Sequence, residues 1–540
     1  MLYRKMISVF LLISILTLTL AGCKGSNKPS NADKTIVYGL TDEPKTLDPQ
    51  IASDSSSIIA VEALFEGLVR LDADGEAIPG TAEQWHANAD STEFTFSLRS
   101  GAKWKNKEPV TANDFVYAFR RAVSPQTNSA VCSQMFCLKN ASQIHEGKAP
   151  TEQLGVSAVD SHTLKVELEY SYPDFPKLTA NTVFMPCNQK FFESTSGRYG
   201  LDSSFVLGNG PFRIDGTYGW AHDQYLNLKR SSTYSGSQSP LPSNLKFCVN
   251  GEGTDLNDPV AALESETVDV ISVSAAQAKK AKENGCTIAS FQNSTWGLCF
   301  NTSSDLMKNV NIRKAFVQAL NRKKLLSHLP QDTSAADTLL LPNTTFLGEN
   351  YRKLTGISPF LLTQDTNASK TLSTGLAELG LSEMKSISVL CPNDENVKRM
   401  LNEMIISWNA QFHQYFNMEA MDESTLLSKI GSGNYEAALF PISPDSDGPS
   451  QVLSLFRSKA KGNFTGYSNS AYDSLLEKAE NGKGTGAAAD YAAAEEYLNR
   501  QAVFYPLYYG KQYYAVAKGV SGIVFHPYQG GIDFISAGKE

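Results

Sequence analysis

The sequence predicts a mixed α/β protein built from more than one lobe. Strand-like and helix-like patterns alternate along the whole chain, as they do in α/β proteins. The 540 residues are more than one hydrophobic core accommodates, so we expect two or three lobes. With 41% hydrophobic and 19% charged residues, the composition is globular. The formal net charge of −8 comes without clusters of Lys or Arg, which argues against nucleic acid as a partner.

Two regions show the two-residue period of half-buried strands. In residues 94–98, and again in residues 164–168, apolar side chains alternate with polar ones. Between these regions, Thr111 precedes Asp114 by three residues, which predicts a helix that begins with a side-chain cap. We therefore expect strands on either side of a helix.

Three further segments have the apolar spacing of amphipathic helices. The spacing i, i+3, i+4, i+7 runs through residues 312–320, more clearly through 397–408, and more briefly through 472–479. We expect the Met and aromatic side chains of these stripes to pack in a core rather than to hold a cofactor.

The N-terminus resembles the export signal of a bacterial lipoprotein. After two basic residues, positions 7–20 are uncharged; this run is shorter than the about 20 residues of a membrane span and suits a signal peptide over residues 1–22. It ends in Leu20-Ala-Gly-Cys23, which resembles a lipobox and predicts a lipid, such as palmitate, on Cys23. Residues 23–34 are polar and predict a tether. The alternative is an ordinary signal peptide with a chance cysteine.

Cysteine usage leaves the redox state open. Beyond Cys23 the chain has Cys132, Cys137, Cys187, Cys248, Cys286, Cys299 and Cys391. Exported chains permit disulfides; Cys132 with Cys137 is one candidate pair, and two among Cys248, Cys286 and Cys299 are another. Buried thiols in an organism that lives without oxygen are the alternative, because spacing does not determine connectivity.

Motifs of enzyme chemistry are absent from the sequence. It has no Gly-x-Ser-x-Gly elbow, no phosphate-binding Gly-x-x-x-x-Gly-Lys-Ser/Thr loop and no His-Glu-x-x-His sequence. The seven histidines are scattered, and no Cys and His residues have the spacing of a zinc site. We therefore expect a binding protein with no catalytic residue, no metal and no cofactor.

Six short segments, spread from residue 38 to residue 534, carry a family resemblance. They are Tyr38-Gly-Leu-Thr-Asp-Glu-Pro-Lys-Thr-Leu-Asp-Pro49; Leu64-Phe-Glu-Gly-Leu-Val69 with Ile78-Pro-Gly-Thr-Ala-Glu-Gln-Trp85; Phe94-Thr-Phe-Ser-Leu-Arg99 with Pro109-Val-Thr-Ala-Asn-Asp-Phe-Val116; Gly208-Asn-Gly-Pro-Phe212; Phe300-Asn-Thr302 with Val310-Asn-Ile-Arg-Lys-Ala-Phe316; and Ile532-Asp-Phe534. Their shared order resembles the extracytoplasmic solute-binding proteins of peptide-type ABC importers, solute-binding family 5. We interpret them as fold markers rather than ligand contacts.

The resemblance implies a periplasmic-binding-protein-like fold, in which two lobes close on a ligand and an extra domain is added. Residues 35–66, 188–290 and 506–540 are expected to form lobe I, residues 67–187 the extra domain, and residues 291–505 lobe II. The chain would cross between the lobes near residues 291–300 and 504–509, and we expect these segments to act as hinges.

The resemblance also implies a ligand site in the cleft between the lobes. In peptide-binding members, an aspartate in a pattern like Gly-Trp-x-x-Asp-Tyr-x-x-Pro pairs with the α-ammonium of the ligand. Aligned on Pro449, this aspartate corresponds to Asp445. A carboxylate there would hold an amine by a charge-assisted hydrogen bond. The alternative is that Asp445 and Asp447 are ordinary turn residues beside Gly448 and Pro449.

This sequence departs from the family pattern around Asp445. Pro441, which has no N–H to offer a bound chain, replaces the glycine. Ile442 replaces the tryptophan, Ser446 replaces the tyrosine, and Leu439 stands where some oligopeptide binders have an arginine. The cleft would therefore hold a peptide differently or hold another small solute. Ile442, Ser443 and Ser446 remain candidate ligand contacts.

Other candidate contacts come from elsewhere in the chain. On the opposite wall, the loop after Pro49 is expected to contribute Ser53, Asp54 and Ser55, with Asp54 as a second anionic group. Gln134 and Trp296 fall at aligned cleft positions. Trp296 would either stack on a ring of the ligand or pack against the hinge.

We therefore expect a lipid-anchored substrate-binding protein at the outer face of a cell membrane, in a single-membrane, Gram-positive type of cell. It would capture oligopeptides as a monomer and deliver them to the permease subunits of an ABC importer. The alternatives are a binder of a non-peptide solute, a peptide pheromone receptor on the same fold, and a secreted hydrolase.

Overall fold

The computed structural model describes residues 35–251, 254–329, 333–356, 361–444, 446–460, 462–482, 484–528 and 531–540. The expected signal peptide and tether, with Cys23, lie outside the described residues. The candidate ligand residue Asp445 also lies outside them. These features therefore stay predictions.

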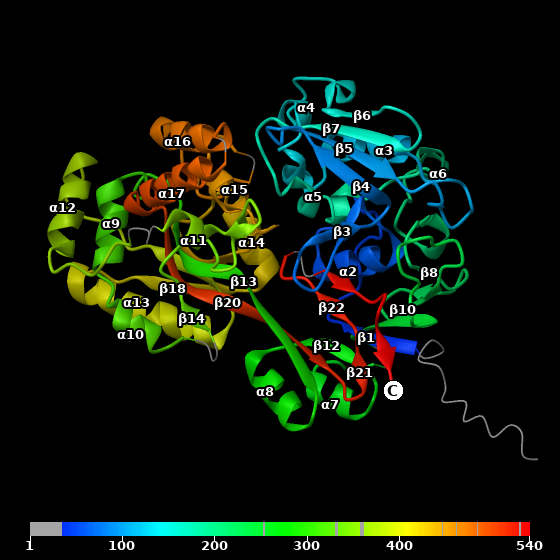
Figure 1. The fold of residues 1–540 in the computed structure, drawn as a ribbon. Coiled ribbons are helices and arrows are strands. Elements are labelled where there is room, and N and C mark those ends of the chain that lie inside the picture. The colour runs from blue at the N-terminus through cyan, green and yellow to red at the C-terminus, as the bar shows by residue number, and fades with distance from the viewer. Residues whose placement is uncertain are drawn as a thin grey trace, which may run out of the picture.

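A sheet of twelve strands extends through both halves of the molecule (Figure 1). Its order is β18-β17-β19-β13-β20-β12-β1-β11-β10-β8, with β9 (Trp220–Ala221) beside β10 and β14 (Ser334–Ala335) beside β20. One end contains β1 (Thr35–Leu40), β8 (Phe212–Ile214), β10 (Tyr225–Arg230), β11 (Asn244–Val249) and β12 (Val270–Val273). The other end contains β17 (Ser388–Pro392), β18 (Asn417–Met421) and β19 (Ala437–Ile442). We call these ends lobe I and lobe II.

Two long strands, β13 (Thr287–Phe300) and β20 (Phe504–Val516), carry the chain between the lobes. They pair in antiparallel fashion along their length, with β12 beside β20 at one end and β19 beside β13 at the other. The register shifts between Gln292 and Ser294 and between Trp296 and Gly297, and such irregularities bend a strand. The predicted crossing segments 291–300 and 504–509 lie within these strands, and their action as hinges stays a prediction.

Lobe I surrounds a helix that is buried on nearly every side. Helix α2 (Ser55–Leu64) begins at Asp54, whose Oδ1 accepts a hydrogen bond of 2.9 Å from the Ser57 N–H. The helix is apolar around its whole circumference, as expected of a core helix, and Glu62 is its only charged residue. Helices α7 (Pro259–Glu264) and α8 (Ala275–Glu283) pack against β12, β13 and β20.

The extra domain is built on a separate four-stranded sheet. Its order is β4 (Ala82–Ala87), β5 (Glu93–Leu98), β7 (Thr163–Glu167) and β6 (Val156–Ala158). Helix α3 (Ala112–Val123) contacts β6 and β7, and the Thr111 N–H donates to the Asp114 carboxylate at 2.7 Å in a capping box. The predicted strands at 94–98 and 164–168 and the predicted cap are confirmed. One hydrophobic core joins this domain to lobe I.

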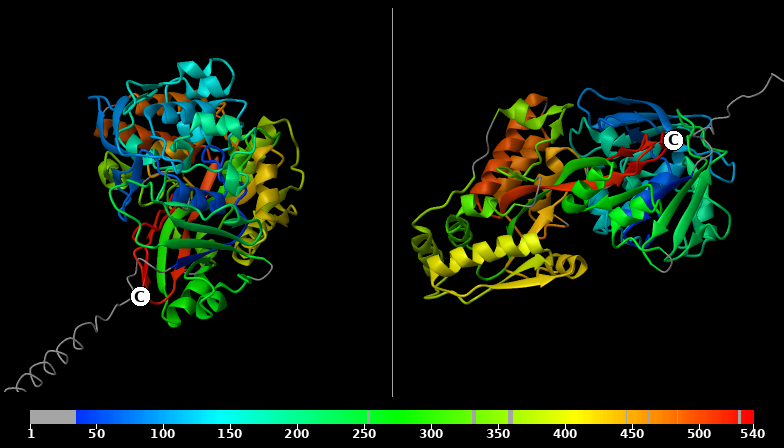
Figure 2. Two further views of the ribbon diagram at one scale, coloured as in Figure 1. Left: turned by 90° about the vertical axis from the view of Figure 1, so that its right-hand side faces the viewer. Right: turned by 90° about the horizontal axis from the view of Figure 1, so that it is seen from below.

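Lobe II has helices on both faces of its sheet (Figure 2). Ala437 and Leu439 of β19 pack with α9 (Val310–Gln318), α12 (Ala368–Glu378) and α13 (Glu395–Phe412). Ala438, Phe440 and Ile442 point to the opposite face, toward α16 (Ser470–Glu480) and α17 (Thr485–Arg500). A strand buried on both faces has no polar alternation, which explains its continuous apolar sequence. The helices predicted from residues 312–320, 397–408 and 472–479 are confirmed.

The cysteines that the structure describes form no disulfide among Cys137, Cys187, Cys248, Cys286, Cys299 and Cys391. Cys137 Sγ instead lies 3.8 Å from the Gln134 carbonyl, so its candidate pairing with Cys132 is not made. Cys132 Sγ lies 3.5 Å from Nδ1 of buried His145. The alternative of buried thiols therefore holds for these residues, with Cys286 half-buried.

None of the helices in the described ranges combines the length and hydropathy that a membrane crossing requires.

Candidate functional site

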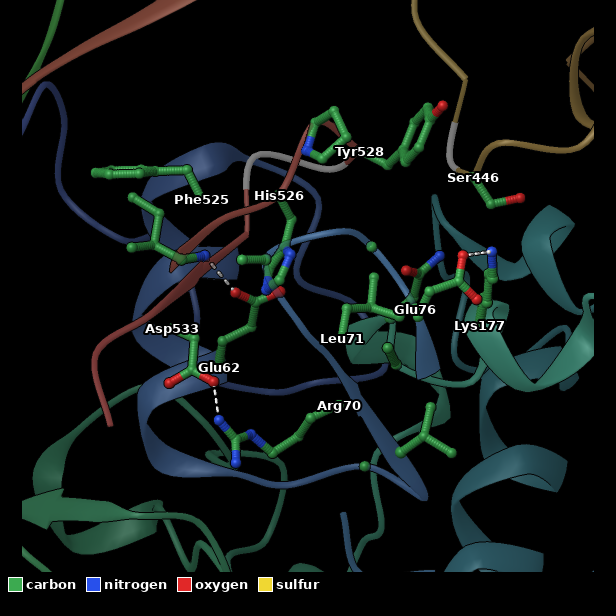
Figure 3. Close-up of a pocket in the computed structure, with 18 of the residues that line it drawn as sticks. Glu62, Arg70, Leu71, Glu76, Lys177, Ser446, Phe525, His526, Tyr528 and Asp533 are labelled. Atoms are coloured by element: carbon green, nitrogen blue, oxygen red, sulfur yellow. Dashed lines mark hydrogen bonds and ion pairs between the residues drawn. The ribbon is translucent and has the colours of Figure 1, made fainter. Parts of the chain in front are cut away.

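A cavity of about 420 Å³ lies between the lobes and the extra domain (Figure 3). Its lining comes from residues within 62–76, 177–185, 211–212, 290–291, 343–345, 446–447, 525–528 and 532–535. These segments belong to lobe I, the extra domain, the crossing strand β13, lobe II and the C-terminal tail. Because the lobes and the extra domain together enclose this cavity, a movement of one relative to another opens or closes it. We therefore take the cavity as the candidate ligand site of the described structure.

The wall on the lobe I side joins α2 and the chain after it to the C-terminal tail. Glu62 Oε2 accepts a hydrogen bond of 2.7 Å from the Ile532 N–H. Arg70, on β2 (Val69–Leu71), forms an ion pair with Asp533, on β23 (Ile532–Asp533). These contacts hold the tail against α2, and β23 pairs with β22 (Val524–Phe525) beside the cavity.

Burial changes the protonation of groups in this wall. It raises the pKa of Glu62 to about 8, while the Ile532 N–H opposes the rise and the nearby Asp533 charge adds to it. Burial also raises the pKa of Glu66, although a hydrogen bond of 2.5 Å from the Tyr234 hydroxyl and the charge of Arg70 oppose it. The pKa of His526 is lowered by burial, so its imidazole is neutral at pH 7. The wall therefore holds carboxyl groups and a neutral histidine around one ion pair.

Contacts join the extra domain to lobe II beside the cavity, a region that we call its mouth. The Tyr172 hydroxyl lies 3.1 Å from the Ser446 hydroxyl, and both residues are buried. Asp174 Oδ2 accepts a hydrogen bond of 3.1 Å from the Leu347 N–H. The extra domain therefore touches lobe II at polar groups, which can exchange these partners for water when the lobes separate.

Lys177 and Asp447 form a further contact across this mouth. Lys177, on α5 (Phe175–Leu178), places its ammonium 2.8 Å from Glu76 and 3.6 Å from Asp447. Asp447 Oδ2 also accepts one hydrogen bond of 2.5 Å from the Thr345 hydroxyl. Burial, and then the charge of Asp447, raises the pKa of Asp174 to about 6. Two acidic groups thus share one lysine where the extra domain meets lobe II.

Of the candidate residues around β19, one lines the cavity and the others that the structure describes do not. Ser446 lines the cavity and is buried. Ile442 is 4% exposed and packs in the core of lobe II, while Ser443 is exposed outside the lining. Pro441 is in register with Trp296 of β13, so the sheet occupies that side of its backbone. A ligand role for these residues and for Asp445 stays a prediction.

The candidate residues of the loop before α2 lie outside the cavity lining. Asp54 caps α2 through Ser57, with its Oδ2 accepting a second hydrogen bond of 2.7 Å from the Ser57 hydroxyl. Ser53 and Ser55 are exposed. Capping of a helix N-terminus is a sufficient reason for an aspartate at position 54. A ligand role for these three residues stays a prediction.

Gln134 and Trp296 do not line the cavity, although Gln134 contacts a residue that does. Gln134 is 5% exposed, and its Oε1 accepts a hydrogen bond of 3.3 Å from Asn181, which does line the cavity. The Trp296 ring stacks on Tyr508 of β20, with centroids 5.6 Å apart and planes 8° apart. Trp296 thus packs against the neighbouring crossing strand, and its role toward a ligand or in the hinge stays a prediction.

Several wall residues were not predicted from sequence: Glu62, Arg70, Lys177, His526, Tyr528 and Asp533. Two of them were near motifs already noted, since Arg70 follows Leu64-Phe-Glu-Gly-Leu-Val69 and Asp533 lies in Ile532-Asp-Phe534. We interpreted these motifs as fold markers only. The pairing of Arg70 with Asp533 shows that they also build the cavity wall. Within the described ranges, no group of three or more His, Cys, Asp or Glu residues is arranged so that it could bind a metal ion.

The chain is similar to proteins of known sequence and structure along most of its length. Residues 76–464 match the model of the bacterial extracellular solute-binding proteins, family 5 Middle. The chain is 27% identical over 502 residues to the oligopeptide-binding protein OppA of Bacillus subtilis (strain 168), covering 88% of this chain and 89% of that protein. It is 28% identical over 505 residues to the periplasmic murein peptide-binding protein MppA of Escherichia coli (strain K12), covering 92% of each.

Solved structures share the fold. The OppA of Listeria monocytogenes bound to peptide is 26% identical, with a TM-score of 0.77 over 94% of this chain and 99% of that chain. The oligopeptide ABC transporter substrate-binding domain of Bacillus anthracis gives the same TM-score of 0.77 at 25% identity. The predicted fold class, two lobes and an extra domain around a cleft, is confirmed.

Proposed function

Because this chain belongs to the bacterial extracellular solute-binding proteins of family 5, we propose that it captures oligopeptides between its lobes and delivers them to an ABC importer. The observation that carries the proposal is the cavity of about 420 Å³ enclosed jointly by lobe I, the extra domain and lobe II. Similar proteins, covering 88% and 92% of the chain, are named for oligopeptide and murein peptide binding. No covalent chemistry is needed for this role.

Capture would couple ligand binding to the contacts across the mouth. The bridges from Tyr172 to Ser446 and from Asp174 to Leu347 form only when the extra domain and lobe II are close together. A peptide that touches both walls binds the closed arrangement better than the open one, and this difference in affinity is what shifts the balance toward closure. The closed surface spanning both lobes would then be the one that the permease recognises.

Asp445 remains our candidate for the α-ammonium of the peptide. Its chain neighbours Ser446 and Asp447 both line the cavity. Replacing Asp445 by Ala should weaken a peptide with a free amine by more than about 1.5 kcal/mol, because a charge-assisted hydrogen bond is lost.

Calorimetry with matched peptides tests both the function and the residue. Tri- to pentapeptides should bind the wild-type protein, and Asp445→Ala should weaken the free peptides while leaving their N-acetylated counterparts unaffected. Equal affinity of Asp445→Ala and wild type for free peptides would remove Asp445 from the site. Failure of every peptide to bind, together with a non-peptide compound found by mass spectrometry of the native protein, would overturn the peptide proposal.

A second candidate ligand is a non-peptide solute. It is favoured by Pro441, whose ring nitrogen offers no hydrogen bond to a peptide main chain and whose backbone is already in register with Trp296. The same mass spectrometry of the native protein distinguishes the two classes of ligand.

The membrane anchor is a separate part of the proposal. We propose that lipid on Cys23 tethers the protein to the outer face of the membrane, where a tether raises its local concentration at the permease. Cys23→Ser should leave peptide binding intact and release the protein from the membrane fraction. A mutant that stays with the membranes would contradict the anchor, and co-purification with a signalling protein instead of a permease would favour the receptor alternative.

A further inference from the structure

The basic groups Arg70 and Lys177 of the cavity wall are matched by acidic partners, whereas the acidic residue Glu62 has no such partner among the described residues. Arg70 is paired with Asp533, and Lys177 lies 2.8 Å from Glu76 and 3.6 Å from Asp447. Glu62 has no ion pair with any base in the part of the chain that the structure describes. Its Oε2 accepts one hydrogen bond from the Ile532 N–H, and its Oε1 accepts none from the described residues. The lining therefore has more carboxyl groups than cations. Of those without an ion pair in the described ranges, Glu66 accepts a hydrogen bond from the Tyr234 hydroxyl and Asp74 is exposed, which leaves Glu62.

The C-terminal tail passes close to the Glu62 carboxyl group without placing a side chain over it. The next residue of the tail that faces it is Gly531, where an added Cβ would lie 2.4 Å from Oε1 and 2.7 Å from Oε2. Only a glycine lets the tail pass this close to the carboxyl group without a side chain over it. Glu62 itself is half-buried and belongs to the lining (Figure 3).

A second polar group in the same cavity also lacks a partner. The hydroxyl of Tyr528 is buried and forms no hydrogen bond with the described residues. Tyr528 lines the cavity from the same C-terminal tail that approaches Glu62 (Figure 3). Buried polar groups in proteins are almost always satisfied, so an unsatisfied hydroxyl and an unmatched carboxyl group around one cavity point to a polar, positively charged group of a ligand.

We propose that Glu62 determines specificity by receiving a cationic group of the bound ligand, the side chain of a lysine or arginine in a peptide. The inference rests on the proposed function and extends it by naming a ligand class. The neighbouring groups permit this: Arg70 is paired with Asp533, and the only charge that acts noticeably on Glu62 among the described residues is the negative one of Asp533. His526 is neutral because burial lowers its pKa, so it does not repel the cation.

Binding of a cation at Glu62 should release a proton, which a purely structural role of Glu62 would not do. Since burial raises the pKa of Glu62 to about 8, its carboxyl group is mostly protonated at pH 7. An ammonium or guanidinium group favours the ionised form. The O–H bond of Glu62 therefore breaks on binding, and the proton leaves to the buffer while the ligand cation takes its place. A peptide with an uncharged side chain at this position releases no such proton.

A lysine scan of alanine-based tripeptides tests the proposal. Each lysine peptide is compared with a norleucine peptide of the same length, and calorimetry is run in two buffers of different ionisation enthalpy to count released protons. The wild-type protein should prefer one lysine peptide by roughly tenfold or more, as a charge-assisted hydrogen bond allows, with close to one proton released. Glu62→Gln, whose amide oxygen can still accept from the Ile532 N–H, should lose the preference and the proton release while keeping its affinity for the norleucine peptide.

The matched control is Glu167→Gln, since Glu167 lies outside the cavity lining and has Lys139 as its partner at 3.0 Å. It should keep the lysine preference. Equal binding of lysine and norleucine peptides at every position by the wild type, or a preference that survives in Glu62→Gln, would overturn the role of Glu62 and leave the proposed function standing. If no peptide of either kind binds, the proposed function fails and this inference falls with it.

Discussion

The buried ion pair between Asp48 and Arg121 joins lobe I to the extra domain, and breaking it should destabilise the fold strongly. Arg121, in the last turn of α3, donates to Asp48 Oδ2 at 2.8 Å and to Oδ1 at 2.5 Å. The two side chains are only 9% and 4% exposed. Burial lowers the pKa of the guanidinium, but the Asp48 carboxylate more than offsets this and raises it. Replacing Asp48 by Asn would leave this cation buried without a countercharge.

The expected magnitude follows from what remains around Arg121. Loss of one partner of a buried ion pair costs about 3–5 kcal/mol. The guanidinium keeps its hydrogen bond to Gln50 and its position 4.5 Å from the centroid of the Phe192 ring, and both contacts offset part of the loss. We therefore expect Asp48→Asn to lower the free energy of unfolding by about 3 kcal/mol.

An exposed ion pair in the same domain provides the control. Lys139 and Glu167 lie 3.0 Å apart with side chains 53% and 38% exposed, so Glu167→Gln should cost less than about 1 kcal/mol. Urea unfolding measures both variants. Adding Arg121→Met to Asp48→Asn should recover stability, because no unpaired buried charge is left. A cost for Asp48→Asn no larger than that for Glu167→Gln would refute this reasoning.

Three further predictions concern the cavity, its mouth and the thiols. In the folded protein the raised pKa of Glu62 keeps its carboxyl group protonated up to about pH 8, whereas in the unfolded chain the pKa has its usual, lower value. The free energy of unfolding of the wild type should therefore fall between pH 5 and pH 9 by about 2–4 kcal/mol more than that of Glu62→Gln. Urea unfolding that shows the same pH dependence for both proteins would contradict this. Tyr172→Phe removes the hydroxyl that contacts the Ser446 hydroxyl across the mouth, and a loss of about 1 kcal/mol should lower the closed-to-open ratio roughly fivefold. Small-angle scattering of the unliganded Tyr172→Phe protein should then show a larger radius of gyration than that of the control Tyr170→Phe. Identical scattering profiles would contradict a role of this contact in holding the lobes closed. Cys286 is half-buried, whereas the cysteines at 137, 187, 248, 299 and 391 are buried. In a Cys23→Ser background a thiol reagent should therefore label Cys286 first. A fast labelling phase that persists after Cys286→Ser would show that another cysteine is accessible to the reagent.

The local elements of this fold were predictable because short-range interactions decide them. The alternation of Phe94, Phe96 and Leu98 gives a strand with one buried face, and the structure shows that pattern of burial in β5. The Thr111–Asp114 cap and the apolar stripe of α13 depend on residues three or four positions apart. Segments recognised in order along the chain predicted the two-lobe fold with its extra domain, although none of them alone specifies it.

The cavity wall was not predictable in the same way. Arg70 and Asp533 are 463 residues apart, and Glu62 meets Ile532 across 470 residues. No local pattern distinguishes a glutamate that lacks a cation from one on a solvated helix face, because the difference lies in which charges the fold brings near it. Asp54 shows the converse: the structure gives it a helix cap that was not predicted from the sequence, while its predicted ligand contact stays a prediction.

By itself the sequence determined the elements, their order, the family and the expected export signal, all of which depend on periodicity, caps and short motifs. The tertiary structure decided which charges are matched. Asp48 is matched because α3 places Arg121 against it, and Glu62 lacks a cation because the C-terminal tail passes it at Gly531, which has no side chain. The physical reason is that electrostatic and desolvation energies depend on distance and burial in space, which chain order does not record.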